Sequence, residues 1–321
     1  MDVSVIVPTH NRKALLEACI GSLFGQDYPQ DDYEVVIVDD SSNDGTQEMV
    51  RRLAQRHKNL RYFKEKKKGP AAARNLGASV SHGEIICFTD DDCVVSASWV
   101  RDMFAAHKGN PGVSAIGGYT EVDPNNTKAV TSQFLSTGAI KLRLNGREEV
   151  AFFPTCNVSY KRDIFEEEKF NESFPFPAGE DLEFCWRLFK AGKKFVHSPE
   201  IKVFHDCHRG SFLSFLRQAY MYGRGNYMVQ YIHKDHPLLK EFGVNGSLSF
   251  STTFVFNMMK IPYFSFTMTR WLLLSKKYPM LKLFEKSQIF YSFTIFKFSY
   301  LMGSLIERAK IVRRLKGTKK A

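Results

Sequence analysis

The sequence predicts an α/β fold, built on a parallel β-sheet with helices on both faces. Two short apolar runs rich in β-branched residues, 3–7 and 35–38, flank a segment whose apolar residues recur at helical spacing, 13–24. Strands that are apolar throughout are typical of parallel sheets, because helices cover such sheets from both sides. The chain has 321 residues, 44% of them hydrophobic and 25% charged, which suffices for a large globular core and excludes a disordered chain.

The alternation of strands and helices continues beyond residue 40. The acidic clusters come directly after apolar strands, which places them where open α/β sheets bind their ligands, at the carboxyl ends of the strands. The further elements predicted on these grounds are helices at 46–57, 70–81, 99–107 and 181–191, and strands at 61–63, 84–88, 113–118, 150–153, 194–196 and 201–204.

The composition changes at about residue 210, which predicts a core domain at 1–210 and a helical, aromatic-rich, basic extension at 211–321. Residues 1–206 carry 26 Lys and Arg against 30 Asp and Glu, whereas residues 207–321 carry 19 against 4, so the net charges are −4 and +15. A tail with this excess of cations is typical of proteins that bind an anionic partner.

The extension predicts attachment to a membrane surface. Segment 242–259 is too polar for an easy crossing, and segment 287–306 is apolar around most of its helical circumference but contains Lys297. Aromatic rings beside Lys and Arg suit the headgroup boundary of an anionic bilayer. We expect peripheral binding to the inner face of the cell membrane, with a spanning tail or an aromatic core packed against the first domain as alternatives. The rings concerned are Phe250, Phe254, Phe256, Phe264, Trp271, Phe290, Phe293, Phe296 and Phe298.

The cysteines and the amino terminus predict a cytoplasmic protein. Six cysteines are scattered without a CxxC pair, and neither a basic region nor a small-residue cleavage site accompanies the first apolar run. A reduced protein without a signal peptide is therefore expected.

Three consecutive carboxylates, Asp90, Asp91 and Asp92, follow the strand predicted at 84–88. Adjacent carboxylates repel one another, so a cation or hydrogen-bond donors must join them. Mg²⁺ and Mn²⁺ prefer carboxylate oxygens and commonly bind one or two of them together with substrate phosphates. The triplet therefore predicts a divalent-cation site. For Asp44 an equally simple role is to cap the helix that begins near residue 46.

Five segments, taken together, resemble the family 2 glycosyltransferases, which have the GT-A fold, a Rossmann-like fold of nucleotide-diphospho-sugar transferases. The resemblance implies a mixed, mainly parallel sheet with helices on both faces. The five segments occur in order over 1–210, and the resemblance implies a nucleotide-binding half at about 1–95 and an acceptor half at about 96–210 of a catalytic domain. The segments are VSVIVPTHNR at 3–12, VIVDDSSNDGT at 36–46, GPAAARNLGA at 69–78, FTDDD at 88–92 and AGEDLEFCWR at 178–187.

The resemblance also implies which residues form the site. Asp181 would be the general base, with Glu180 and Asn157 on the acceptor side. Asp92 and His205 would hold the metal; the triplet leaves Asp91 as a second choice for this role, and the alternative for His205 is an ordinary polar residue at a strand end. The donor-binding residues would be Pro8, Thr9, Asp40, Arg74, Asp90 and Asp91.

A zinc site near His205 is not expected from the sequence. Cys207 and His208 follow closely, but no second ligand pair at a recognised spacing accompanies them.

The resemblance implies inverting transfer of a sugar from a nucleotide-diphosphate donor, with a UDP-sugar favoured, to a hydroxyl of a glycan or lipid-linked acceptor. It further implies dependence on Mn²⁺ or Mg²⁺ and a place in surface polysaccharide or glycolipid assembly. The alternative is a protein that binds a nucleotide sugar or nucleic acid without transferase activity. Nucleic acid is not the expected partner, because the cations of the tail accompany apolar, Phe-rich segments that a phosphate-binding surface does not need.

Overall fold

The computed structural model describes residues 1–66, 69–137, 141–144, 147–174, 176–206, 211–236 and 283–318. The chain forms two compact units, one of Met1–Val122 with Thr137–Cys207 and one of Asp123–Ser136 with His208–Ala321. We call them the sheet unit and the helical unit. The sequence-based division at 210 differs from this one in residues 123–136, which belong to the helical unit.

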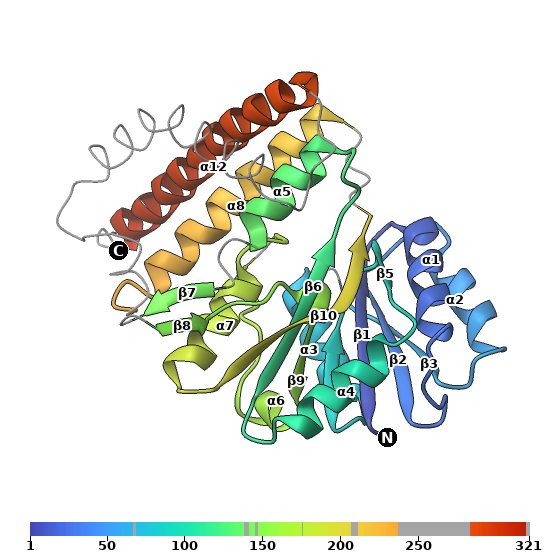
Figure 1. Cartoon of the computed structure of the whole chain (residues 1–321). Helices are drawn as coiled ribbons and strands as arrows, with labels where there is room; N and C mark the ends of the chain where they lie inside the picture. The colour runs from blue at the N-terminus through green and yellow to red at the C-terminus, as the bar shows by residue number, and fades with distance from the viewer. Residues whose placement is uncertain are drawn as a thin grey trace. The chain divides into compact units, whose positions relative to one another are not determined.

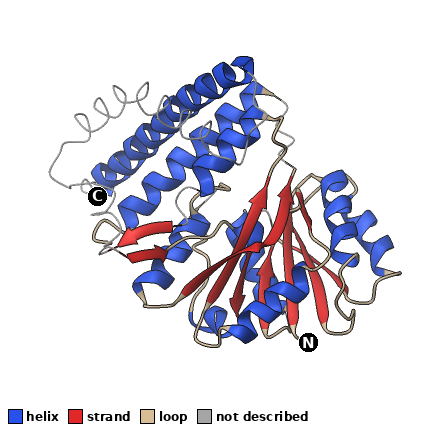
Figure 2. Cartoon of the chain, viewed as in Figure 1, coloured by secondary structure: helices blue, strands red, loops and turns tan. Residues whose placement is uncertain are grey.

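The sheet unit contains one mixed sheet, shown in Figure 2, in which eight strands are described, in the order β3-β2-β1-β4-β9-β6-β10-β5. Strands β3, β2, β1 and β4 are parallel, β9 runs antiparallel to both of its neighbours, and β10 is parallel to β6 and antiparallel to β5. The predicted mixed, mainly parallel sheet is thereby confirmed. The strands are β1 (Val3–Thr9), β2 (Tyr33–Asp39), β3 (Leu60–Lys64), β4 (Ile85–Phe88), β5 (Cys93–Val95), β6 (Ala115–Glu121), β9 (Val158–Lys161) and β10 (Phe195–His205).

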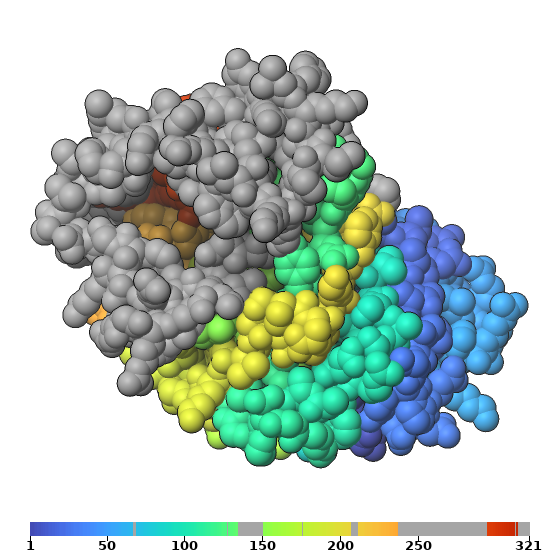
Figure 3. All heavy atoms as spheres, viewed as in Figure 1, coloured from blue at the N-terminus to red at the C-terminus, as the bar shows by residue number. Residues whose placement is uncertain are grey.

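Helices cover both faces of this sheet, and each face has its own hydrophobic core (Figures 1 and 2). The first core joins Val5 of β1 to helices α1 (Lys13–Phe24), α2 (Thr46–Ala54) and α4 (Trp99–Gly109). The second core joins the next residue, Ile6, to helices α3 (Pro70–Val80), α6 (Asp163–Glu167) and α7 (Glu180–Lys190). Side chains alternate between the faces of a strand, so the fully apolar runs supply both cores at once. In the space-filling view α4 (teal) lies against β10 (yellow) on one side of the sheet unit (Figure 3).

Two sequence-based predictions of strands differ from the structure. The strand predicted at 150–153 is wrong: Val150 ends the short strand β8 (Arg147–Val150), which pairs with β7 (Lys141–Leu144), and the rest of the run is irregular. This run is apolar because its side chains fill the core; a Cβ on Gly117 would lie 2.0 Å from the ring of Phe153. The strands predicted at 194–196 and 201–204 are parts of the single strand β10.

The helical unit contains α5 (Thr127–Thr137), α8 (Phe212–Ile232) and α12 (Leu283–Thr318). Helices α8 and α12 approach so closely that a Cβ on Gly223 would lie 1.7 Å from the carbonyl oxygen of Tyr300. An ion pair between Arg224 and the buried Glu307, 2.7 Å apart, joins the same two helices. In the part of the chain that the structure describes, no helix is both long and apolar enough to cross a bilayer. Segment 242–259 and the rings from Phe250 to Trp271 lie outside the described residues.

Candidate functional site

The candidate site lies where the order of the strands reverses. From β1 the chain moves outward through β2 to β3, and then returns to the other side of β1 with β4. Open α/β sheets bind ligands beyond the carboxyl ends of their strands at such a point. Residues that the sequence analysis selected lie at these strand ends: Pro8 and Thr9 end β1, Asp40 follows β2, and Asp90, Asp91 and Asp92 follow β4.

The acidic triplet is held by the turn that follows β1. Thr9 donates a hydrogen bond from Oγ1 to Asp91 Oδ2, at 2.8 Å. Arg12 Nη1 donates to Asp91 Oδ1 at 2.9 Å and to Asp92 Oδ2 at 2.8 Å. Burial raises the pKa of Asp91 to about 6 and the charge of Asp92 adds to this effect, although Arg12 opposes both. The charge repulsion expected between the carboxylates is thus relieved partly by a guanidinium.

Asp92 also faces the end of β10. His205 Nε2 lies 3.0 Å from Asp92 Oδ1, and the backbone N–H of Asp206 donates to the carbonyl of Asp92 at 2.8 Å. Ligand atoms of Asp92, Cys93 and His205 all lie within 4.8 Å of one another. Carboxylate oxygen and imidazole nitrogen fit a divalent cation such as Mn²⁺, so the residues assigned to the metal from the sequence are close enough to share one.

A second acidic pair lies at the start of α7, which follows Gly179 in a left-handed conformation (φ 92°). Arg74 Nη1 donates to Glu180 Oε1 at 2.8 Å, and Arg74 Nη2 donates to Asp90 Oδ1 at 3.2 Å. Arg74 and Glu180 are only 5% and 4% exposed. A buried guanidinium on α3 therefore links the triplet after β4 to the first turn of α7.

Asp181 is the carboxylate next to this buried pair, and it is half-buried. Its Oδ1 accepts a hydrogen bond from the N–H of Leu182 at 2.8 Å. Burial raises the pKa of Asp181 to about 7, the charges of Glu180 and Asp90 raise it as well, and Arg74 opposes the shift. A carboxyl group that titrates near neutral pH can take a proton from a hydroxyl, which is the task of a general base.

The two acidic residues at the end of β2 differ in their exposure and in their hydrogen-bond partners. Asp39 is fully buried and accepts hydrogen bonds from Ser42 and Tyr62, whereas Asp40 is partly exposed and accepts from the N–H of Gly69 at 3.1 Å. Asp40 thus lies at the edge of the site, and Pro8 lies in β1 beside β2.

The alternative role of Asp44 as a cap is confirmed. Its carboxylate accepts hydrogen bonds from the N–H groups of Thr46 and Lys13, the first residues of α2 and α1.

The structure places Asn157 inside the sheet unit. Its side chain is 1% exposed; Oδ1 accepts from Trp99 Nε1, and Nδ2 donates to the carbonyls of Tyr119 and Ile201. Both the oxygen and the nitrogen of the amide are engaged in these bonds, so Asn157 acts in the packing of the core and not on the acceptor side of the site.

Arg12 is the site residue that sequence reasoning missed. Its signal was present, because three adjacent carboxylates require cations, and Arg12 stands in the PTHNR turn after the first strand.

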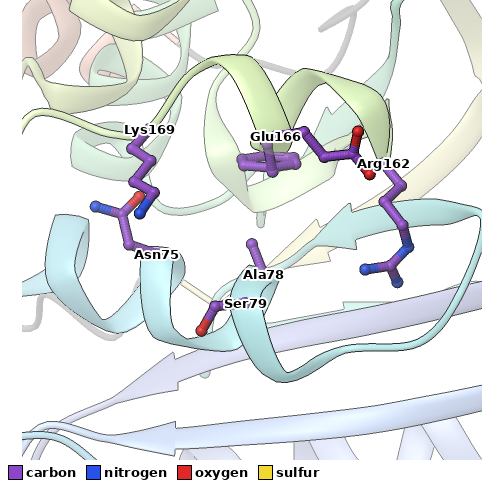
Figure 4. A pocket seen from close by; sticks show the side chains of 7 residues that line it. Asn75, Ala78, Ser79, Arg162, Glu166 and Lys169 are labelled. Atoms are coloured by element: carbon purple, nitrogen blue, oxygen red, sulfur yellow. The ribbon is translucent and has the colours of Figure 1, made fainter.

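A cavity of about 170 Å³ lies apart from these residues, between α3 and α6 (Figure 4). The acids of the site, Asp90, Asp91, Asp92, Glu180 and Asp181, do not line it. Its lining consists of Asn75, Ala78, Ser79, Arg162, Phe165, Glu166 and Lys169.

Comparison with known proteins supports one family. The model of the family described as Glycosyl transferase family 2 matches residues 4–168. Glycosyltransferase AglE of Haloferax volcanii is 28% identical over 233 residues, covering 71% of this chain and 73% of its own. The GalNAc(5)-diNAcBac-PP-undecaprenol beta-1,3-glucosyltransferase of Campylobacter jejuni is 30% identical over 202 residues, covering 61% and 62%.

A similar solved structure is the mannosyltransferase PcManGT of Pyrobaculum calidifontis, determined in complex with GDP-Man and Mn²⁺. It superposes with a TM-score of 0.62 at 19% identity, over 94% of this chain and 86% of its own. This likeness establishes a shared GT-A fold.

The link between Arg74 and Glu180 can be tested by a double-mutant cycle. We expect Arg74→Met to lower the free energy of unfolding by about 3–5 kcal/mol, because it leaves the buried Glu180 carboxylate without its partner. Adding Glu180→Gln should recover most of this loss. Urea unfolding followed by the fluorescence of the buried Trp99 and Trp186 would measure it.

Arg101→Met is the matched control. Arg101 pairs with Asp27 on the surface, with side chains 51% and 45% exposed, so its loss should cost less than about 1 kcal/mol. Equal effects of the two single substitutions would contradict the structural role of Arg74.

Proposed function

The chain belongs to glycosyl transferase family 2, and from this membership we propose that it is an inverting, divalent-cation-dependent glycosyltransferase. The observation that carries the proposal is the bridge made by Arg74, which brings Asp90 of the triplet and Glu180, the neighbour of Asp181, into one site. A cation site and a general base within one site are what the transfer of a sugar from a nucleoside diphosphate to a hydroxyl requires.

The donor would bind over the carboxyl ends of β1, β2 and β4. Asp40, Pro8 and Thr9 would face the nucleotide, and Asp92 with His205 would hold the divalent cation. The cation, when bound, stabilises the negative charge that develops on the departing nucleoside diphosphate. We favour a UDP-sugar as donor.

Arg74 would act as a positioning residue. Both of its terminal nitrogens already donate to carboxylates of the chain, and only 5% of the residue is exposed. It would fix the position of the acidic triplet relative to the first turn of α7. The bound donor and the base would then both lie next to the reacting atoms.

Asp181 would remove the proton of the acceptor hydroxyl while the bond to the nucleoside diphosphate breaks. One carboxylate suffices for a single displacement, which inverts the anomeric carbon, whereas retention would require a second nucleophile. The raised pKa makes this carboxylate a stronger base than an exposed aspartate.

The acceptor would be a hydroxyl of a glycan or a lipid-linked sugar, in the assembly of a surface polysaccharide or glycolipid. The name of the Campylobacter relative includes an undecaprenol-linked glycan. The proposed location is the cytoplasmic face of a membrane. In support, α8 begins with Phe212 and Leu213, 52% and 74% exposed, and α12 carries the exposed cations Lys310 and Arg313.

The proposed function is tested by a screen of UDP- and GDP-sugars for hydrolysis with Mn²⁺, with Mg²⁺ and with a chelator. We expect one donor to be hydrolysed only with a divalent cation, and Asp92→Ala to reduce the rate by about 10²–10³ because a charge-stabilising group is lost. Asp31 is an exposed acid just before the amino end of β2, away from the carboxyl ends of the strands, so Asp31→Ala should retain the parent rate. Hydrolysis that persists in the chelator would contradict the cation's role.

The base is tested by the pH dependence of transfer. Activity should rise with pH through about 7, because Asp181 must lose its proton to act, and should fall about tenfold per unit below that value. Asp181→Asn should still bind donor, measured by calorimetry, but transfer at least about 100-fold more slowly. Full activity of Asp181→Asn, or a product that retains the anomeric configuration, would eliminate the mechanism.

Membrane attachment is tested by sedimentation with vesicles at low salt. The protein should pellet with phosphatidylglycerol vesicles and not with phosphatidylcholine, because each cation near an anionic surface contributes about 1 kcal/mol. Replacing both Phe212 and Leu213 by Ser should weaken binding about tenfold or more. Phe204→Ser, which removes a ring 39% exposed on the sheet unit, should pellet like the parent. A parent protein that stays in the supernatant would exclude this attachment.

A further inference from the structure

The thiol of Cys93 belongs to the same cluster as the two residues assigned to the donor cation. Cys93 lies in β5, and its antiparallel partner in β10 is His205. Directly opposite residues of an antiparallel pair have Cβ atoms about 4.5–5.5 Å apart and side chains on the same face. With Asp92 as its preceding residue, Cys93 completes a set of three ligand atoms within 4.8 Å of one another. We call Asp92, Cys93 and His205 the thiol triad.

Hard cations and thiophilic cations should use this triad differently. Mg²⁺ and Mn²⁺ prefer oxygen ligands and have little affinity for a thiol, so two of the three residues serve them. Zn²⁺ binds Cys sulfur, His nitrogen and Asp oxygen, and three protein ligands with one open position are the usual set of an accessible zinc site. The triad offers one ligand of each kind.

We propose that the thiol triad is a zinc-binding site that overlaps the donor-cation site, so that Zn²⁺ excludes the catalytic cation and blocks transfer. The inference rests on the proposed function in one respect, the assignment of the donor cation to Asp92 and His205. Binding of Zn²⁺ through Cys93 displaces the thiol proton to solvent, and neither the protein nor the metal changes oxidation state.

The surroundings of the triad allow this coordination with small side-chain movements. Zinc bonds of about 2.0–2.3 Å place tetrahedral ligand atoms about 3.3–3.8 Å from one another. His205 Nε2 and Asp92 Oδ1 are already 3.0 Å apart, and all three ligand atoms of the triad lie within 4.8 Å of one another. The backbone is already fixed, because Asp206 N–H donates to the carbonyl of Asp92 and Cys93 N–H donates to that of Asp90. His205 has a side chain that is 15% exposed, which provides the route of entry for an ion.

A second thiol supports the sulfur of Cys93. The two thiols of Cys93 and Cys156 are in hydrogen-bond contact, and Thr120 Oγ1 lies 3.5 Å from the sulfur of Cys156. Both cysteines are free and buried. Partners of this kind around a ligand fix its orientation, as the outer contacts of metal ligands commonly do.

Co²⁺ serves as the spectroscopic probe, because it takes zinc sites and shows a thiolate-to-metal charge-transfer band when a cysteine coordinates it. The full chain, freed of metal and kept reduced, would be titrated with Co²⁺ alone. We expect the band to saturate at about one Co²⁺ per chain and to disappear when one equivalent of Zn²⁺ is added. No band in the parent protein would overturn the proposal.

Two cysteine variants identify the ligand. Cys93→Ser should lose the band and bind Zn²⁺ at least about tenfold more weakly, while its affinity for Mn²⁺ stays within about threefold of the parent. Cys207→Ser is the matched control, since Cys207 is the cysteine closest to His205 in sequence, and it should keep the band. A band that survives in Cys93→Ser, or that only Cys207→Ser removes, would overturn the proposal.

The zinc site and the transferase activity are tested by different measurements, the Co²⁺ charge-transfer band and the hydrolysis of nucleotide sugars. Thermal unfolding without metal shows whether Cys93→Ser is folded, and the band of the parent protein needs no variant. Failure to hydrolyse any nucleotide sugar would contradict the transferase and leave the expected spectrum unchanged. A Mn²⁺-dependent transferase without the thiolate band would contradict the zinc site alone.

Discussion

Five carboxylates meet at one edge of the sheet, and the arrangement of the site follows from the need to neutralise them. Burying an ionised carboxylate without a partner costs several kcal/mol, so the fold must provide cations or donors wherever it gathers acids. Two guanidiniums and one imidazole meet this need in part, and the remaining negative charge is complementary to a divalent cation. The carboxylates are Asp90, Asp91, Asp92, Glu180 and Asp181, the guanidiniums are those of Arg12 and Arg74, and the imidazole is that of His205.

The acids differ in whether a guanidinium binds them, and this difference suits them to different roles. Arg12 joins Asp91 to Asp92, and Arg74 joins Asp90 to Glu180, so four of the five acids have a guanidinium partner. Asp181 has its hydrogen bond from the backbone of Leu182, and its pKa rises to about 7 through burial and the neighbouring charges. Among the described residues, the acid of this group that has no hydrogen bond from a guanidinium is therefore the one suited to take a proton near neutral pH.

Local sequence patterns predicted the strands and the helix that carry the site. They did not predict the contacts that form between segments far apart in the sequence. The strands before Asp40 and Asp90 follow from continuous apolar runs, and the helix that begins at Glu180 follows from apolar residues at helical spacing. The pairing of Arg12 with the triplet depends on β1 and β4 being neighbours, which no short window of sequence reveals.

Residues that the sequence analysis misjudged share this dependence on distant partners. Strand β9 was missed because its central residue, Ser159, is polar yet fully buried, where it hydrogen-bonds to the carbonyl of Ile116 on a different strand. Asn157 was assigned to the acceptor side, but Trp99 and two backbone carbonyls engage its amide inside the core. A polar residue beside a predicted site can equally well be a core residue whose partners lie far away in sequence.

A register irregularity in β10 places the His205 side chain on the face of the sheet that carries the site. Between His197 and Lys202 the chain advances five residues while β6 advances two, from Gly117 to Tyr119, so β10 carries three extra residues. Side chains alternate along a strand with a period of two, and an odd number of extra residues therefore moves every later side chain to the opposite face. The cores show this exchange: Val196 and Val203, seven positions apart, both pack in the first core. Without the irregularity, His205 would lie on the face of the second core, away from Asp92 and Cys93, and the proposed cation site would lack its nitrogen ligand.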